Sequence, residues 1–485
     1  MSSTRPKNKA KLGPTVRRLR RNRGLTQARL AEQLGISAPY LNLIEHNQRN
    51  VTAELLLKLA DMFGLELGEL LNNDENRLFS DLMESLSDTL FDGHDVTNLD
   101  VRDLVGTHPV IAQAFLTLYD NYRNAKTDLS SLSERMAVTG GDADEIGASS
   151  IPSDVVSDFI QASNNYFPQL EKVAQNVRGM LDTDDDPYQA LVHHLESSYG
   201  GVRVAFLPAT AQNVSHGTVR RYDPASRTLV VSELLSPSGR LFQVAHQIGL
   251  LAASQEINEL LQDGGVTQGD AYALGRSALA NYFAGALIMP YDAFLEAARF
   301  SRYDIEMLEH RFGVTFEQAC HRLTTLQRPG AKGVPFHMLR VDIAGNTSKR
   351  FSASGLRIPR HGGACPRWNV YSAFMTPGRI HTQLGIWPDG SSYFCIARSI
   401  RKRGGRYGVS ESYYSIGLGC DASYAKELVY ADGVDLTNPD KAVPVGTSCR
   451  ICERMNCRQR AFPPVHHRLD IDENSRGLSA YVTAR

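Results

Sequence analysis

Three cysteines near the C-terminal end of the chain have a spacing that suits metal chemistry. Cys449, Cys452 and Cys457 form the pattern C-x2-C-x4-C. Thiolates hold zinc ions and iron–sulfur clusters, and thiols at this density are seldom purely structural in a reducing compartment. Seven cysteines in 485 residues do not make a disulfide scaffold. The pattern therefore indicates a metal–thiolate site.

A fourth ligand is needed, and the sequence leaves its identity open. A zinc ribbon would show a second C-x2-C pair, but a histidine, His466 or His467, could complete a Cys3His zinc site. A [4Fe–4S] cluster takes three close cysteines and a distant one. Cys365, in HGGACPRW, and Cys420, in SIGLGCD, are the candidates for that distant ligand. We expect the cluster, with zinc as the alternative.

A second segment of chemical interest is the predicted helix SGRLFQVAHQIGLL. It has the character of a zinc-peptidase helix, H-E-x-x-H, in which the glutamate is the general base and both histidines bind zinc. Here His246 is followed by Gln247 and Leu250. An amide cannot take a proton and leucine cannot bind metal, so we expect no catalysis and a core-packing role for His246. An active zinc peptidase is the least favoured alternative.

The first 25 residues contain basic side chains and no acid, and they lead into a set of short predicted helices. Gln27–Leu34 and Ala38–Glu45 are separated by a tight turn at Gly35 and are preceded by the capping residues Thr26 and Ser37. Thr52–Phe63 and Leu65–Leu71 would complete a compact bundle. Its expected core is formed by Leu30, Ala31, Leu34, Ile36, Leu41 and Ile44.

The segment LTQARLAEQLGISAPYLNLIEHNQRNVT resembles the Cro/repressor helix-turn-helix family. The resemblance implies that the helix Ser37–Glu45 enters the major groove of DNA. The residues expected to face base edges are Ser37, Ala38, Pro39 and Asn42. Those expected to contact phosphates are Gln27, Tyr40 and Arg49. A protein–protein module with the same fold is the alternative.

The region between the helix-turn-helix and the segment of His246 is predicted to contain two helices separated by a linker. His108–Met136 reads as a long helix with an apolar stripe, which could pack within the chain or form a dimer contact. Ala137–Ser150 is rich in Gly, Asp and Ser and is predicted to be a linker. Pro152–Met180 then reads as another helix.

The C-terminal third alternates between strand and helix patterns around the cysteines. Ile380–Trp387, Ser392–Ser399 and Ser410–Gly417 have strand character, and Ala422–Tyr430 reads as a helix. The run RSIRKRGGRY contains Arg398, Arg401, Lys402, Arg403 and Arg406. These cations could hold ligand phosphates or could form a solvated hairpin.

The motifs, in order, resemble a known family of bacterial regulators. ALANYFAGALIMP is similar to the second helix of IrrE/ImmA-like metallopeptidases, with Ser277 where that family has a glutamate ligand. With GGACPRWNVYSAF, GLGCD, LVYADGVDL and CRICERMNCRQRAFPP, the chain resembles the short-chain fatty acyl-CoA regulators. The resemblance implies control of acetate, propionate, glyoxylate or methylcitrate metabolism, a GAF-like domain that binds a short acyl-CoA, and a [4Fe–4S] cluster. Trp368, Arg398, Arg401 and Arg403 are candidate acyl-CoA contacts.

Composition and charge agree with a multidomain globular protein that binds DNA through one basic part. Hydrophobic residues make up 42%, charged residues 22%, and the net charge is −1. We find no secretory signal and no apolar run of about 18 residues, so we expect a cytoplasmic protein without membrane contact.

The expected architecture has four parts. Residues 1–75 form an all-α helix-turn-helix domain, 76–150 a helical linker, 151–330 an α-rich, zincin-like domain, and 331–485 an α/β, GAF-like domain with the metal–thiolate site. The expected protein is a non-enzymatic homodimer or higher homo-oligomer on operator DNA. A redox- or iron-sensing regulator without an acyl-CoA ligand is the alternative.

Overall fold

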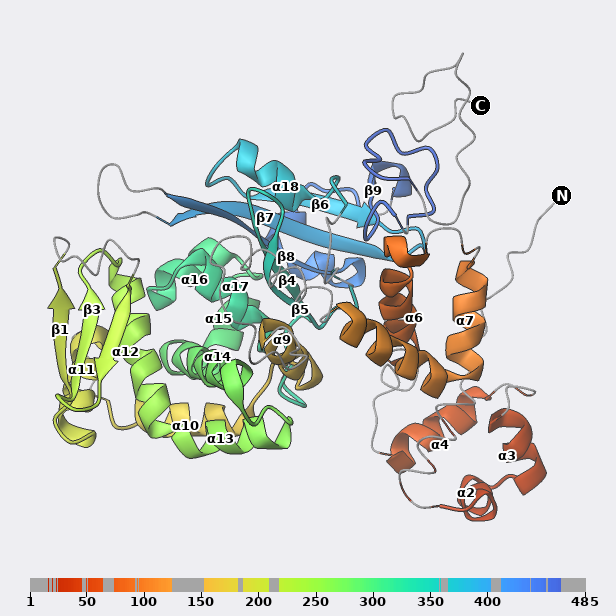
Figure 1. The fold of residues 1–485 in the computed structure, drawn as a ribbon, viewed down its shortest axis with the longest axis horizontal. Helices are drawn as coiled ribbons and strands as arrows, with labels where there is room; N and C mark the ends of the chain where they lie inside the picture. Colours follow the sequence, from red (N-terminus) through yellow and green to blue (C-terminus); the bar gives the residue numbers. More distant parts are fainter. Residues whose placement is uncertain are drawn as a thin grey trace, which may run out of the picture. The chain divides into compact units, whose positions relative to one another are not determined.

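The computed structural model describes residues 16, 20, 23, 25–45, 49, 51–63, 74–91, 94, 96–123, 152–181, 186–208, 218–356, 358, 365–402, 411–436, 438–450 and 452–463. These residues belong to two compact units, one before residue 143 and one after it, called here the N-terminal and C-terminal units (Figure 1). The elements predicted at 65–71 and 137–150 lie outside the described residues.

The start of the N-terminal unit is a small helical bundle with its own core. Its helices are α2 (Gln27–Leu34), α3 (Ala38–Glu45) and α4 (Ala53–Phe63). The Thr26 hydroxyl accepts the Arg29 N–H at 3.2 Å, and Gly35 ends α2 with φ of 71°. The expected core is confirmed, except that Ile36 is only half-buried. Its buried members are Val16, Leu30, Ala31, Leu34, Leu41, Ile44, Leu55, Leu59 and Phe63.

A second core in the N-terminal unit joins α6 (Asp74–Ser85), α7 (Asn98–Thr107) and a helix at residues 109–123. The buried side chains include Leu82, Val105, Ala112 and Leu116. Thr97 and Asp100 form a capping box that starts α7. The long helix predicted from His108 is present as far as residue 123, and its remaining residues lie outside the described part.

The C-terminal unit begins with two helices, α9 (Pro152–Ala162) and α10 (Pro168–Arg178), where a single one was predicted. That prediction is wrong because the chain turns at Asn164 and Asn165, both with positive φ, and Pro168 then starts a new helix. The turn is fixed from inside, since the Asn165 side chain donates to the Thr324 hydroxyl at 2.8 Å.

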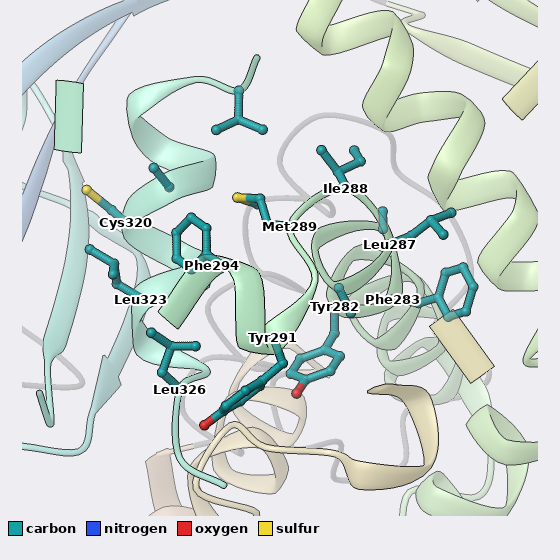
Figure 2. Close-up of a cluster of buried hydrophobic side chains, with 14 of the residues drawn as sticks. Tyr282, Phe283, Leu287, Ile288, Met289, Tyr291, Phe294, Cys320, Leu323 and Leu326 are labelled. Atoms are coloured by element: carbon teal, nitrogen blue, oxygen red, sulfur yellow. The ribbon is translucent and has the colours of Figure 1, made fainter. Parts of the chain in front are cut away.

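A small sheet and a set of helices follow. α11 (Pro187–Ser198) precedes β1 (Arg203–Leu207), β2 (Arg220–Asp223) and β3 (Thr228–Ser232), with β3 parallel to β1 and antiparallel to β2. α12 (Pro237–Ala252) packs against this sheet and against α14 (Gly269–Ile288). The remaining helices are α13 (Ser254–Asp263), α15 (Tyr291–Phe300), α16 (Ile305–Phe312) and α17 (Phe316–Thr324). Figure 2 shows side chains of α14, α15 and α17 filling their common core.

The last part is a mixed six-stranded sheet in the order β5-β4-β8-β7-β6-β9. Its strands are β4 (His337–Asp342), β5 (Thr347–Ser352), β6 (His381–Ile386), β7 (Ser392–Lys402), β8 (Ser412–Asp421) and β9 (Val443–Pro444). All pairs are antiparallel except β6 with β9. A short helix, α18 (Asn369–Ser372), and the 3-10 turn Ala373–Met375 connect β5 to β6.

The helix predicted at 422–430 is instead two 3-10 turns, Ala422–Glu427 and Val429–Ala431. They are too short for α-helical hydrogen bonding, and the first is capped by the Asp421 carboxylate, which accepts the Ser423 N–H at 2.9 Å. A further 3-10 turn, Pro439–Lys441, precedes β9.

Side chains of the six-stranded sheet alternate between two cores, as the period of a strand requires. On β7, Phe394 and Ile396 join the core of the helical part, while Tyr393 and Ala397 join a smaller core on the other face. The helical part and one face of this sheet therefore share one continuous core. Gln161 of α9 also exchanges two hydrogen bonds with the backbone of Ser352.

Candidate functional site

The first candidate site is the exposed face of α3. Ser37, Pro39 and Asn42 are exposed, while Ala38 and Tyr40 are half-buried. The Ser37 hydroxyl also accepts the Tyr40 N–H at 3.3 Å, so it caps the helix that it precedes. Arg49 is exposed beyond the C-terminal end of α3. This helix therefore presents small and polar side chains to its surroundings.

Glu45, at the end of α3, fixes this helix to the rest of the bundle. Its side chain is buried, and it accepts from the Arg20 guanidinium at 2.6 and 3.0 Å and from the Gln27 amide at 2.7 Å. The hydrogen bond to Glu45 is the main cause that raises the pKa of Arg20. Gln27 also donates to Asn42 at 3.2 Å, so the first residue of α2 contacts the exposed face of α3.

The second candidate site is the cysteine loop, defined as residues 445–450 and 452–463. It follows β9 and is tied to the segment of Cys365, whose N–H donates to the Thr447 carbonyl at 3.0 Å. Burial raises the pKa values of the Cys365 and Cys452 thiols. Cys449 and Cys452 lie near enough to Cys365 for their charges to raise its pKa further. Cys457 has the same effect on the pKa of Cys452.

Backbone N–H groups point at these sulfurs, as they do in sites that hold thiolates. The Cys365 sulfur accepts from Gly446 and Arg367, the Cys452 sulfur from Arg454, and the Cys449 sulfur from Ala461 at 3.4 Å. Gly446 lies close against the Cys452 side chain, since a Cβ there would make a tight contact, 3.0 Å from its sulfur. The loop is therefore shaped around its thiols.

A buried arginine holds the cysteine loop in this shape. Arg460 is 5% exposed, and its guanidinium donates to the carbonyls of Cys449, Cys452 and Arg454 at 2.6, 2.7 and 2.8 Å. The Arg454 side chain donates in turn to the Ile386 carbonyl at 2.9 Å and attaches the loop to β6. The roles of Arg454 and Arg460 were not expected from the sequence, although the four arginines within residues 449–460 are a signal that could have been used.

The structure separates the two predicted candidates for a fourth ligand. Cys365 lies beside the cysteine loop, in the core that also contains Trp368 and Val445. Cys420, on β8, is fully buried in the other core, among the side chains that pack against the helical part. His466 and His467 lie outside the described residues.

The spacing of the thiols bears on which metal group the cysteine loop could hold. Zinc needs its ligands at about 2.0–2.3 Å from one point. Among the residues that the structure describes, no three histidine, cysteine or acidic side chains converge closely enough to hold an ion. A four-iron cluster is larger than an ion and takes each thiolate on a different iron, so its ligands stand further apart than those of a zinc ion.

The predicted acyl-CoA contacts do not come together in one place. Trp368 is 5% exposed, with its ring centroid 6.0 Å from that of Trp387. Arg398 lies on the opposite face of β7, where it pairs with Glu309 of α16 at 3.1 Å. Arg401 pairs with Glu411 at 3.4 Å, and Arg403 lies outside the described residues.

The predicted decayed site on α12 contains a buried histidine and lies against a half-buried arginine, Arg220. His246 is 4% exposed, and burial, with help from the charge of Arg220, lowers its pKa to about 3. The Arg220 guanidinium, from β2, donates to the Gln247 side-chain oxygen at 2.7 Å. The His246 Nδ1 has no hydrogen-bond partner within the described part of the chain. His246 is therefore neutral and packed in the core.

Three family models match consecutive parts of the chain. Residues 16–70 match a helix-turn-helix model, residues 198–324 an IrrE N-terminal-like domain, and residues 325–481 the C-terminal domain of short-chain fatty acyl coenzyme A regulators. The regulator RamB of Mycobacterium tuberculosis is 38% identical over 478 residues, which cover 98% of this chain and 99% of RamB. The chain belongs to the family of short-chain fatty acyl-CoA regulators.

A second curated relative and a solved structure are also similar to this chain. The propionyl-CoA carboxylase regulator of Cereibacter sphaeroides is 39% identical over 97% of this chain and 98% of its own. A solved structure of a Mycobacterium tuberculosis transcriptional regulator is 39% identical, with a TM-score of 0.65, and covers 69% of this chain and 100% of its own. Thus the chain is a multidomain protein with an N-terminal helix-turn-helix, a middle IrrE-like domain and a C-terminal domain built on a mixed sheet.

In this family member the residues of α12 do not fit a zinc ion. Gln247 and Leu250 stand where a zinc peptidase has its base and its second histidine, and Ser277 of α14 is not a metal ligand of the usual kind. The guanidinium of Arg220 already places a positive charge against Gln247. Among the described residues, no helix is long and apolar enough to cross a membrane.

Proposed function

We propose that the protein is a cytoplasmic, DNA-binding transcriptional regulator of short-chain fatty acid metabolism, without enzymatic activity, whose effector is a short-chain acyl-CoA. The observation that carries this proposal is the similarity over 97–98% of the chain to RamB and to the propionyl-CoA carboxylase regulator. The match of residues 325–481 to the regulator's own C-terminal model supports the effector class. Acetate, propionate, glyoxylate or methylcitrate genes are the proposed targets.

On DNA, α3 is proposed to occupy the major groove. Ser37, Ala38, Pro39 and Asn42 would face the bases, and Gln27, Tyr40 and Arg49 the phosphates. The contact between Gln27 and Asn42 supports a shared role, because an amide held by its neighbour keeps a fixed direction. Asn42→Ala should weaken binding to the operator by about 1–3 kcal/mol and leave non-specific DNA binding unchanged.

A homodimer is proposed to place two such helices on a two-fold operator. The helix at 109–123 supports this, because one of its faces is buried in its own unit and another is apolar and exposed. Val110, Ile111 and Leu118 are 79%, 58% and 68% exposed. Replacing Ile111 and Leu118 by glutamate should give monomers in sedimentation experiments, whereas an unchanged oligomer would assign the contact elsewhere.

The cysteine loop is proposed to hold a [4Fe–4S] cluster through Cys365, Cys449, Cys452 and Cys457. The donor set, the N–H groups directed at sulfur and the position of Cys365 support this choice over zinc and over Cys420. When bound, the cluster supplies a redox-active, oxygen-sensitive group. The chain's own residues orient the thiols through Arg460 and exclude bulk water by burying Cys365 and Cys452.

Thermal melting of anaerobically purified protein tests the effector. A ligand that binds only the native state raises stability by about 2.7 kcal/mol at a hundredfold excess over its dissociation constant. We expect a rise with one short acyl-CoA and a smaller one with longer chains or with free CoA. Protein that is folded and iron-loaded but shows no shift with any acyl-CoA would contradict the proposed effector.

A redox or iron sensor without an acyl-CoA ligand is the second candidate function. The gathering of four cysteines favours it, since the same centre could itself be the signal. Operator affinity distinguishes the two candidates. A change on exposure to oxygen that is independent of acyl-CoA supports the sensor, while a change on adding acyl-CoA under argon supports the metabolic regulator.

A further inference from the structure

A surface hollow of about 390 Å³ lies between the two cysteine segments. Its lining residues are Arg367, Asn456, Arg458 and Gln459. Arg367 follows Cys365 by two positions, and the other three flank Cys457. The size falls within the range of small-molecule sites, which is roughly 300–1,000 Å³. These four residues are called the arginine hollow.

The cations of this hollow differ from other arginines of the C-terminal unit, which have partners within the described part of the chain. Arg454 and Arg460 bind backbone carbonyls, and Arg398 pairs with Glu309. By contrast, the guanidinium groups of Arg367 and Arg458 form no hydrogen bond or ion pair with any residue that the structure describes. Two positive charges thus line a concave surface, and no acid of the described part of the chain pairs with them.

The backbone that carries Arg367 is nevertheless fixed. Its carbonyl accepts the Gln383 amide at 2.8 Å, which attaches it to β6, and its N–H points to the Cys365 sulfur. On the other wall, Arg460 anchors the residues around Cys457. The two free guanidinium groups therefore project from walls whose backbones are held, which reduces the entropy lost when a ligand binds.

We propose that the arginine hollow binds a small anion that carries a phosphate or diphosphate group. A guanidinium presents a planar fork of N–H donors that matches phosphate oxygens, and the amides of Asn456 and Gln459 add neutral donors. A ligand held by both walls would also hold Cys365 and Cys457 near each other. Anion binding and retention of the proposed cluster would then be coupled. That coupling rests on the proposed function, whereas anion binding itself does not.

Isothermal titration of the full-length, anaerobically purified protein with inorganic diphosphate tests this proposal. We expect saturable binding, and at least a tenfold loss of affinity in the double variant Arg367→Gln/Arg458→Gln. The control Arg221→Gln/Arg311→Gln removes the same charge from two exposed arginines of the C-terminal unit and should bind as the native protein does. Iron content and melting temperature show that each variant is folded.

Three results would overturn the proposal: no binding of diphosphate, equal binding by the hollow variant, or an equal loss in the control. ADP and coenzyme A serve as further arms that distinguish the source of the phosphate. If both lose affinity in the hollow variant, the site recognises any diphosphate. If coenzyme A alone does, the site receives the phosphate end of that molecule. If acyl-CoA raises the melting temperature as expected but diphosphate does not bind, this inference is wrong and the proposed function is unaffected.

Discussion

The α12 site and the cysteine loop are two regions with metal-type residues, and each contains a well-placed arginine. Arg220 directs its guanidinium at Gln247, a position that would be part of a zinc site. Arg460 directs its guanidinium at four backbone carbonyls of the cysteine loop. In the first region the protein's own cation lies where metal chemistry would occur, and in the second the thiols remain available.

The two regions therefore differ in whether a guanidinium faces the side chains of metal-ligand type. A motif alone does not show this difference, because both segments keep some residues of the right type. The predictions that follow test this comparison, beginning with the largest expected effect.

Cys452→Ser should abolish binding of the proposed iron–sulfur cluster almost completely. Serine is a poor replacement for a thiolate at iron, and Cys452 is central among the thiols of the loop. Iron and sulfide analysis with visible absorption, under argon, measures the loss. Cys365→Ser should have the same effect. Cys420→Ser is the matched control and should keep its iron, so an iron-free Cys420 variant would reverse the choice of fourth ligand.

Restoring the zinc ligands on α12 should fail while Arg220 is present. The variant Gln247→Glu/Leu250→His/Ser277→Glu supplies the missing residue types, but the guanidinium would pair with the new glutamate and repel a dication. Adding Arg220→Ala should improve zinc affinity at least tenfold, as measured with a colorimetric zinc indicator. Equal zinc affinity with and without Arg220 would show that its position does not matter.

Arg220→Ala in the native background should destabilise the C-terminal unit by about 1–3 kcal/mol, because it leaves the buried Gln247 oxygen without a donor. The double variant Arg220→Ala/Gln247→Leu should lose less than the sum of the single variants, since both polar partners are then absent. Urea unfolding of the four proteins gives the coupling energy. Additive losses would mean that the two side chains do not interact.

Acid should lower the free energy of unfolding of the C-terminal unit, because His246 is buried in its neutral form. The pKa of His246 is about 3 in the folded chain and about 6.5 when unfolded, so below pH 6.5 the unfolded state binds more protons. Stability from this residue is present above pH 6.5 and falls toward pH 3 by up to about 1.4 kcal/mol per unit. His246→Gln should flatten the fall seen by urea unfolding, and His337, with a pKa of about 3, should keep its own share. Parallel pH profiles would exclude a buried neutral His246.

In metal-free protein the cysteine loop should respond in the opposite direction. Burial raises the pKa values of the Cys365 and Cys452 thiols, so their contribution is present at neutral pH and lost as the pH rises above the unfolded value of about 8.5. A double Cys365→Ala/Cys452→Ala variant should lose this alkaline sensitivity in unfolding experiments. If the double variant loses stability above pH 8.5 as the native protein does, the titrating groups are not these two thiols.

Local patterns were enough to predict the helix-turn-helix, because its caps, its turn and the core residues that the sequence predicts all lie within residues 26–44. They failed at 152–180, where two asparagines in left-handed conformation interrupt an otherwise helical pattern. Side-chain pairs between distant elements were also beyond local reasoning. Arg220 and Gln247 meet only because β2 and α12 pack together, and Cys365 reaches the cysteine loop only because β9 pairs with β6.

The continuous core of the C-terminal unit has a consequence for how such proteins can be recombined. The two family models meet between residues 324 and 325, yet side chains from both sides of that point fill one interior. A chimera that joins this middle domain to the sheet of a distant relative would bring together two surfaces that were never selected to fit. We therefore expect the two segments to be inherited as a pair across regulators, while the DNA-binding head, which has a core of its own, can be exchanged.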